Sequence, residues 1–342
     1  MPEIQSVLYV QTQGTVLRLE HDTVRIRLKG ESVGQVPLLR LCGIAVFGNV
    51  TITPFLLHRN AEDGRMVAWF SRSGRFRGRL QGRTSGNVLL RRAQHAALDD
   101  GERTMHVARQ IVAAKIQNTR QVLQRAAREA KDLEDQEPLK GVVDRLAALL
   151  PALPAIQDLN ELRGAEGEAA RAYFGVFPHM IRANRSRFEM DGRTRRPPRD
   201  PMNALLSFLY ALVSAECASA LEGVGLDPQM GFLHALRPGR PALALDLMEE
   251  FRAVLADRLA LTLVNRQQIK PEDMNREGSF RLTDAARKRV LVAYQQRKEV
   301  EIKHPLLRQN VPLGLVPHIQ ARLLARYLRG DLPGYAPYVA DG

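Results

Sequence analysis

The hydrophobic pattern of the chain changes its period around Asp99, and this change constrains the fold more than any other feature of the sequence. Before it, Val24, Ile26 and Leu28 alternate with basic residues, which is the period of a half-buried strand. After it, the segment 104–132 repeats apolar residues at the spacing of a helix with one buried face. The pattern therefore predicts strands first and helices afterwards.

These two periods predict an α+β fold in which a small β-rich domain precedes a larger all-α domain. We expect the β domain to span residues 1–98 and the helical domain residues 99–342, with a flexible tail from about residue 331. The tail is rich in Pro, Gly and Tyr, and such a segment is either disordered or docked on a partner. Two domains also suit a chain of 342 residues, because single cores rarely grow beyond about 250–300 residues.

The charge balance indicates a polyanionic partner. The formal net charge is +13, and nucleic acid explains such an excess better than an acidic membrane does. Cys42 and Cys217 lie in apolar surroundings, so we expect free thiols in a reducing compartment and no cysteine-based metal site. The N-terminus lacks the pattern of a signal peptide, and no uninterrupted apolar run is long enough to span a membrane. The expected location is the cytoplasm.

Two arginine-rich stretches are candidates for phosphate contacts. From residue 72 to residue 92 the sequence holds seven arginines and no acid, and a strand there would place Arg75, Arg77 and Arg79 on one face. The alternatives are a solvated strand face or an interface with another subunit. In the second stretch, 182–199, a proline-containing loop presents the arginines.

The stretch 231–252 carries the residues that best suit a metal site. His234 ends an apolar run, and Asp246, Glu249 and Glu250 lie in the helix-like segment that follows. Residues three or four apart share a helix face, so Asp246 can stand beside either glutamate. One imidazole and one or two carboxylates suit a divalent metal that keeps open positions for water or phosphate. The alternative is that His234 caps a strand or loop while the carboxylates face water.

Glu166 lies between Gly164 and Gly167, just before a predicted helix from Glu168 to Phe174. Flanking glycines allow a close backbone approach, and a helix start suits a phosphate. The alternative is an ordinary turn between helices with a solvent-facing glutamate.

Four blocks of the sequence resemble, in wording and spacing, the CRISPR adaptation integrases, the family of the CRISPR-associated protein Cas1 (Cas-one). They are RGAEGEAARAYF (163–174), RTRRPPRDPMNALLSFLYALV (193–213), GVGLDPQMGFLH (223–234) and ALALDLMEEFR (242–252). The resemblance extends over nearly the whole chain through VFGN (46–49), SGRFRGRL (73–80) and RQIVAAKIQNTR (109–120). The chain looks most similar to the type I-C form.

The resemblance implies a metal-dependent DNA integrase with associated endonuclease activity. It identifies Glu166, His234 and Glu249 as the catalytic residues that hold Mg²⁺ or Mn²⁺, with Asp246 and Asn203 as possible supporting residues behind them. His234 would then act as a ligand, not as a general base. The motif leaves open which of Asp246 and Glu249 touches the ion. The implied reaction is a transesterification in which the 3′-OH of a protospacer attacks the boundary of a CRISPR repeat.

The resemblance also implies partners. They are double-stranded DNA, a second copy of the chain bound through the β domain, and a Cas2 (Cas-two) dimer in a heterohexameric complex. The basic residues that we expect to contact DNA are Arg75, Arg77, Arg79, Lys115, Arg193, Arg195, Arg196, Arg237 and Arg240. Two other functions stay open at this point: a structure-selective nuclease on branched DNA, in which water is the nucleophile, and an inactive DNA-binding scaffold.

Overall fold

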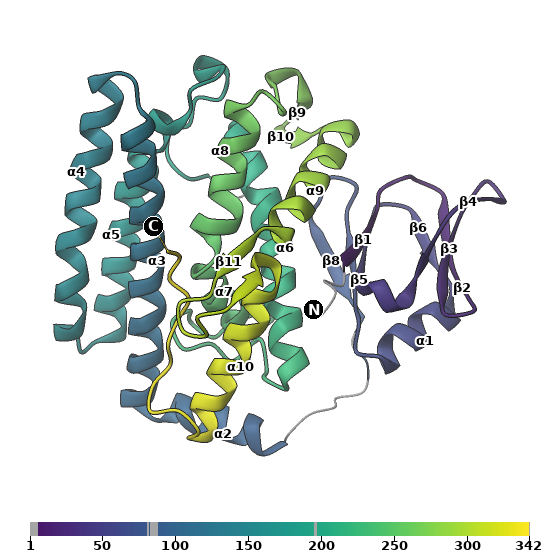
Figure 1. Ribbon diagram of the computed structural model, residues 1–342, viewed down its shortest axis with the longest axis horizontal. Helices are drawn as coiled ribbons and strands as arrows, with labels where there is room; N and C mark the ends of the chain where they lie inside the picture. Colours follow the sequence, from purple (N-terminus) through teal and green to yellow (C-terminus); the bar gives the residue numbers. More distant parts are fainter. Residues whose placement is uncertain (1–5, 81, 83–87, 195–196, 342) are drawn as a thin grey trace.

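The computed structural model describes residues 6–80, 82, 88–194 and 197–341. Figure 1 shows a small strand-rich part beside a larger helical body, in the order that the sequence predicts. The α+β class is thereby confirmed, although the helical body also carries two short hairpins.

The strand-rich part consists of two four-stranded sheets that enclose a shared apolar core. The first sheet has the order β1-β5-β7-β8 and the second β4-β3-β2-β6. The strands are β1 (Ser6–Val10), β2 (Thr15–Glu20), β3 (Thr23–Leu28), β4 (Glu31–Pro37), β5 (Leu41–Phe47), β6 (Val50–Ile52), β7 (Met66–Phe70) and β8 (Phe76–Arg79). Helix α1 (Pro54–Glu62) links β6 to β7 and begins with proline, which suits the first turn of a helix.

Strand β5 contributes to both cores of the molecule, because its side chains alternate between the two faces of the first sheet. Ile44 and Val46 are buried between the sheets, whereas Ala45 and Phe47 are buried against the helical body. This double burial explains why the strand has a nearly continuous apolar sequence.

Apolar and polar contacts join the sheets to the helical body. The rings of Phe47 and Phe208 have centroids 6.1 Å apart. Gly74 has a φ of +87°, and a Cβ on it would come within 2.4 Å of the Phe208 ring, so only glycine fits there. The guanidinium of Arg287 is buried at the same junction, where its Nε donates a hydrogen bond to Gln11.

The helical body contains long helices, two hairpins and short connecting turns. Its α-helices are α2 (Val88–Asp99), α3 (Gly101–Glu129), α4 (Leu133–Leu149), α5 (Leu159–Val176), α6 (Pro201–Val224), α7 (Ala242–Glu249), α8 (Arg258–Asn265), α9 (Asp284–Glu299) and α10 (Val316–Arg329). A π-helix (Arg252–Asp257) leads from α7 to α8. The hairpins are β9 (Met274–Glu277) with β10 (Ser279–Leu282), and β11 (Glu301–Lys303) with β12 (Asn310–Pro312). Short 3-10 turns cover Leu38–Arg40, Leu150–Ala155, Phe177–Met180, Arg185–Arg187, Pro271–Asp273 and Leu313–Leu315.

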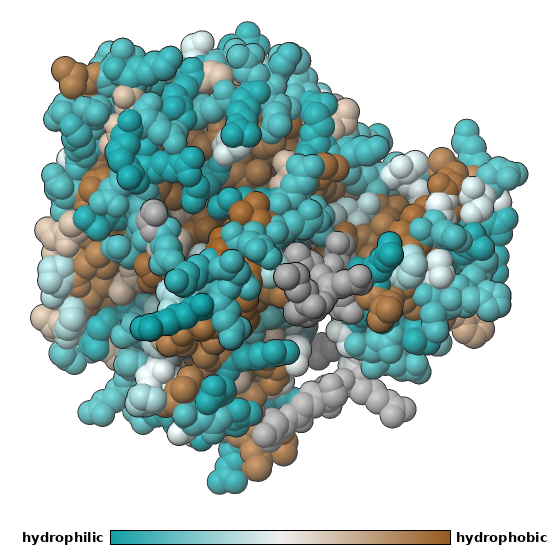
Figure 2. All heavy atoms as spheres, viewed as in Figure 1, coloured by the Kyte–Doolittle hydropathy of each residue, from teal (hydrophilic) through white to brown (hydrophobic). Residues whose placement is uncertain are grey.

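Helix α6 is the central helix of this body. Asp200 caps its first turn, and Gly225 ends it with a φ of +89°, a conformation that favours glycine. The helix is long and apolar enough to cross a membrane, but 72% of its most apolar window is buried inside the protein, as expected for a core helix. On the face shown in Figure 2 the surface is mainly hydrophilic, with apolar residues in scattered patches.

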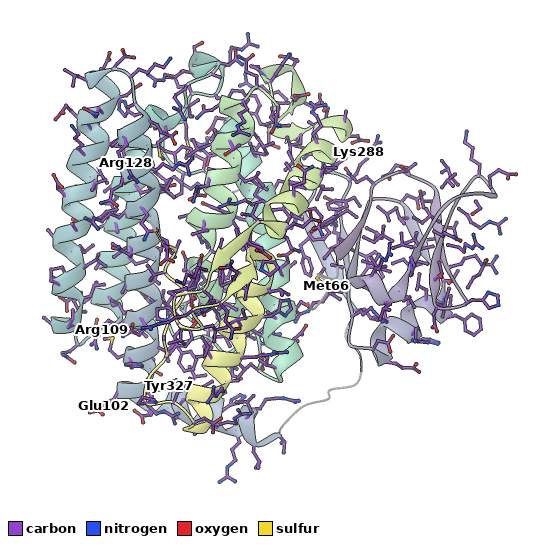
Figure 3. All side chains as sticks on the ribbon, in the orientation of Figure 1. Met66, Glu102, Arg109, Arg128, Lys288 and Tyr327 are labelled. Atoms are coloured by element: carbon purple, nitrogen blue, oxygen red, sulfur yellow. The ribbon has the colours of Figure 1, made fainter. Side chains whose placement is uncertain are left out.

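The helical body begins with α2 at Val88, ahead of the boundary predicted after residue 98. Helix α2 packs against α3 and α10, so it belongs to the helical body and not to the sheets. Figure 3 shows Arg109 and Arg128 along α3, the longest helix of the chain part that is described. The division into domains at residue 98 stays a prediction.

The C-terminal segment 331–341 is packed against the helical body, which differs from the flexible tail that we predicted. Figure 1 shows the segment running along α3, and Tyr338 is 2% exposed. The Tyr338 N–H donates to Glu250 at 2.7 Å, and the Ala340 N–H donates to Asn118 at 2.9 Å. The segment is held in place by hydrogen bonds to Asn118 on α3 and to Glu250 beside α7. The composition of the segment alone does not predict these contacts.

Candidate active site

Three segments that lie far apart in the sequence bring Glu166, His234 and Glu249 to one point. Glu166 lies on α5, His234 in the loop before α7, and Glu249 at the last residue of α7. His234 Nε2 is 3.7 Å from Glu249 Oε1. The ammonium group of Lys115, on α3, contacts Glu166 Oε1 and lies 2.8 Å from Glu249 Oε2. The residues that the resemblance singles out are therefore neighbours, with Lys115 between the two acids.

Asp246 holds the loop that presents His234. Its carboxylate accepts hydrogen bonds from the backbone N–H groups of Phe232, Leu233 and His234 at 2.6, 2.9 and 2.9 Å. The loop can approach α7 this closely because it begins with Gly231, where a Cβ would lie 2.5 Å from the backbone of the first residue of α7. Asp246 is fully buried, and these hydrogen bonds explain how an acid is tolerated in an apolar helix.

The same carboxylate orients the imidazole of His234. Asp246 Oδ1 lies 2.7 Å from His234 Nδ1, and because a carboxylate accepts, Nδ1 carries the proton. The lone pair of Nε2 is then free on the side of Glu249. A metal-binding histidine in proteins is usually held in this way by an acceptor on its other nitrogen.

Glu249 is buried among positive charges. Its side chain is 3% exposed, and Arg252 Nη2 lies 3.0 Å from its Oε1. Burial raises the pKa of Glu249, but the charges of Arg252 and Lys115 outweigh it and lower the pKa to about 2. Glu249 Oε2 lies 2.8 Å from the ammonium of Lys115 and has no other close polar partner among the described residues. Glu249 is thus an anion whose Oε2 is held by that ammonium alone.

This set of side chains fits a divalent cation by its chemistry. Two carboxylates and one imidazole are ligands that Mg²⁺ and Mn²⁺ accept, and the buried Oε2 of Glu249 offers an unused lone pair. As the side chains stand, no three His, Cys, Asp or Glu residues in the described ranges are grouped closely enough to hold an ion. The ammonium of Lys115 lies between Glu166 and Glu249, in contact with both.

A buried network behind the site supports Arg252. The guanidinium groups of Arg252 and Arg193 both lie over the ring of Tyr210, at 4.8 and 5.2 Å from its centroid. The Tyr210 and Tyr173 hydroxyls donate to Asp257, at 2.6 and 3.0 Å. Burial raises the pKa of Asp257 to about 6, although these hydrogen bonds and Arg252 act to lower it. Sequence reasoning missed this network, because Tyr173, Tyr210 and Asp257 look like ordinary core residues of three different helices.

A large groove runs from the site to the strand-rich part. Its volume is about 2560 Å³, and both parts of the molecule line it. Basic residues and the candidate histidine form much of its wall: Arg75, Arg79, Arg91, Arg193, Arg237, Arg240, His234 and Arg252. A groove with this lining can bind a polyanion alongside the candidate site.

The groove brings together five of the nine basic residues that we predicted to contact DNA. They are Arg75, Arg79, Arg193, Arg237 and Arg240, of which Arg79 also forms an ion pair with Glu222 at 2.5 Å. Arg77 is exposed on the same strand as Arg79. Lys115 is instead paired with the two acids, and Arg195 and Arg196 lie outside the described residues.

Two expectations for Glu166, a helix start and a close backbone approach, differ from the structure. Glu166 and its flanking glycines lie inside α5, which begins at Leu159, and a Cβ on either glycine would meet nothing within 4 Å. The predicted helix start and close backbone approach are therefore wrong. Glu250 faces the C-terminal segment and α10, from which Tyr335 and Gln320 respectively donate to it, and burial raises its pKa to about 7.

Asn203, which the resemblance placed near the ligands, ties the loop before α6 to that helix. Its side chain donates to Gly192 at 2.9 Å and accepts from Arg193 at 2.6 Å. It can act on the acids only through Arg193, which shares the Tyr210 ring with Arg252.

Comparison with known proteins gives a consistent result. The family model described as CRISPR associated protein Cas1 matches residues 8–296. The chain is 54% identical over 336 residues to CRISPR-associated endonuclease Cas1 1 of Moorella thermoacetica, covering 98% of each sequence. Its fold is similar to the structure of a CAS1 protein from Thermotoga maritima, with a TM-score of 0.79 and 25% identity over 95% of this chain and 97% of that one. It is also similar in fold to a casposase bound to integration product, with a TM-score of 0.81 and 21% identity over 96% and 93% of the two chains.

Proposed function

Because this chain belongs to the family of the CRISPR associated protein Cas1, we propose that it is a CRISPR integrase that inserts a short DNA duplex at the boundary of a CRISPR repeat. The observation that carries the proposal is the meeting of Glu166, His234 and Glu249 beside a basic groove. A DNA-joining enzyme needs both parts: a centre that activates a phosphodiester, and a surface that holds the DNA backbone.

The ligands of the proposed centre are Glu166, His234 and Glu249. Mg²⁺ or Mn²⁺ held there would supply Lewis-acid polarisation of the scissile phosphate and of the attacking 3′-OH. Asp246 keeps the Nδ1 proton of His234 in place, so Nε2 offers a lone pair throughout the reaction. Arg252 holds Glu249 in its ionised form and fixes one of its oxygens. We propose that His234 uses this lone pair as a ligand of the ion and not as a proton acceptor.

The groove would hold the DNA through its arginines. Arg75 just before β8 and Arg79 in β8 approach it from the strand-rich part, and Arg237 and Arg240 of the loop before α7 approach it from the helical body. Guanidinium groups pair with phosphates in a bidentate manner, which positions a backbone without reading its sequence. We further propose that the protein acts in the cytoplasm as a homodimer, joined through the strand-rich part, and that a Cas2 dimer completes a heterohexamer.

A strand-transfer assay tests the proposal. A duplex with free 3′-OH ends is incubated with a plasmid that carries the repeat, in Mn²⁺ or in EDTA, with and without Cas2. We expect joined products for the wild type in Mn²⁺ and none in EDTA, and none for Glu166→Ala or His234→Ala. Joining by either variant at the wild-type rate would refute the ligand assignment.

Hydrolysis by the same centre is a second candidate function, since the relative from Moorella thermoacetica is named an endonuclease. Water would then replace the 3′-OH as nucleophile, and branched DNA would be the substrate. Metal-dependent cleavage without joining, even when Cas2 is present, would favour this function over integration. DNA binding without either reaction would leave only a scaffold.

A further inference from the structure

Lys115 lies where the two candidate carboxylates meet. Its Nζ contacts Glu166 Oε1 and is 2.8 Å from Glu249 Oε2, and its side chain is 14% exposed. Since Glu249 is 3% exposed, water screens the repulsion between the two acids only weakly. The ammonium is therefore the cation that bridges the two acids, while Arg252 supplies a second positive charge to Glu249.

The other cation beside Glu249 is held differently. Arg252 contacts Oε1, the opposite oxygen, and its guanidinium lies over the Tyr210 ring. Its planar group is fixed by these two contacts, whereas Lys115 carries a point charge on a flexible four-carbon stem. Of the two cations, Lys115 is the one that can leave without rearranging the buried network.

We propose that Lys115 is a tethered counter-ion that competes with the divalent cation for the two carboxylates. This inference rests on the proposed metal-dependent function. Within the described residues, Glu249 Oε2 has no close polar partner besides this ammonium, so it can exchange one cation for another without breaking other contacts. With the ammonium in place, the described residues offer no group of three ligands. The ion can enter only when the ammonium leaves, and Lys115 thus lowers the metal affinity of the site while it keeps the acids together.

Metal binding to the DNA-free protein tests this competition. Mn²⁺ is titrated calorimetrically into the wild type, Lys115→Met and Lys115→Arg. Lys140→Met is the matched control, because Lys140 is an exposed lysine on α4. If the site is free of the ammonium for at most a tenth of the time, its removal should tighten Mn²⁺ binding by roughly tenfold or more. Lys115→Arg keeps a positive charge at the site and should bind Mn²⁺ no more tightly than the wild type. The control Lys140→Met should bind Mn²⁺ with the wild-type affinity.

Thermal unfolding supplies a second readout. Lys115→Met removes the cation that bridges Glu166 and Glu249 and leaves Glu249 paired with Arg252 alone, so the metal-free variant should melt below the wild type in EDTA and gain more than the wild type from Mn²⁺. A variant that folds only with Mn²⁺ would also support the proposal, because the ion would then replace the lost ammonium.

The following results would overturn the inference. In the first, Lys115→Met binds Mn²⁺ no more tightly than the wild type. In the second, Lys115→Arg binds Mn²⁺ more tightly than the wild type. This result would overturn the inference even if Lys115→Met does not fold. If none of the proteins binds Mn²⁺, the proposed metal-dependent function fails and the inference fails with it.

Discussion

The substitution Asp246→Asn exchanges one accepting oxygen for a donating amide nitrogen, at a position where four donors converge. Asp246 accepts from the N–H groups of Phe232, Leu233 and His234 and from His234 Nδ1, at distances between 2.6 and 2.9 Å. If the new nitrogen faces Phe232 and Leu233, two buried N–H groups lose their acceptor. If the new nitrogen faces His234, one buried backbone N–H group loses its acceptor. The imidazole must then use Nδ1 as an acceptor and carry its proton on Nε2.

The second arrangement, with the amide nitrogen facing His234, costs less free energy of unfolding. The size of this cost follows from the groups that it leaves without a partner. One buried N–H without an acceptor, together with the loss of a charged acceptor for the others, should destabilise the protein by about 3 kcal/mol. For a chain of this size the melting temperature should fall by about 4 °C. A proton on Nε2 removes the lone pair from the side of Glu249, so the affinity for Mn²⁺ should fall at least about tenfold.

Urea unfolding in EDTA and calorimetric Mn²⁺ titration measure the two effects separately. Glu249→Gln is the comparison, since it removes a proposed ligand and leaves the Asp246 hydrogen bonds intact. We expect Glu249→Gln to abolish Mn²⁺ binding and Asp246→Asn to weaken it at reduced stability. If Asp246→Asn abolished binding while Glu249→Gln retained it, the two roles would be reversed. An Asp246→Asn protein as stable as the wild type would refute the hydrogen-bond argument.

Three further predictions concern the groups around the site. Burial raises the pKa of Asp257 from 3.8 to about 6, so this group contributes stability that is full below pH 4 and is lost as the pH rises through 6. Stability of the wild type relative to Asp257→Asn should therefore fall by up to about 3 kcal/mol between pH 4 and pH 7, and an equal difference at both pH values would contradict the buried position. A chain that ends at Gly330 loses the buried rings of Tyr335 and Tyr338 and should be less stable by about 5 kcal/mol in urea unfolding; an unchanged unfolding midpoint would show that the segment does not pack on the body. The double variant Arg75→Ala, Arg79→Ala should flatten the dependence of log K for duplex DNA on log salt concentration by about 2, and an unchanged slope would exclude both residues from phosphate contact.

Local periodicity was enough to predict the order of the elements. The alternation in 23–28 and the apolar stripe of 104–132 correspond to β3 and to α3, because burial of one face imposes its period on each element. Helix α5 was mispredicted at its start, since the glycines at 164 and 167 suggested a turn while packing of Leu162, Ala169 and Tyr173 keeps the segment helical. The weak helix propensity of two glycines costs about 2 kcal/mol, which three buried side chains outweigh.

The groups around the site were less predictable, because their partners are distant in the sequence. Lys115 is separated from Glu166 by 51 residues and from the C-terminal end of α7 by a longer interval, so no local spacing links them. The same holds for Tyr338, whose partner Glu250 is 88 residues away. The counter-ion of a buried charge is known only once the helices are packed. Packing is determined by apolar faces, and their pattern in the sequence does not identify ion-pair partners.

The choice between Asp246 and Glu249 as proposed ligand shows the same limit of sequence reasoning. The structure adds what surrounds each carboxylate. The two acids are three residues apart on one face of α7, so helical spacing gives them equal weight as ligands. They differ in what surrounds each carboxylate. Both oxygens of Asp246 are occupied by four donors, so an ion could bind there only by breaking the loop that positions His234. Glu249 Oε2 instead contacts the ammonium of Lys115 and has no other close polar partner among the described residues. A ligand must direct a lone pair at the ion, and these surroundings favour Glu249 over Asp246 as the proposed ligand.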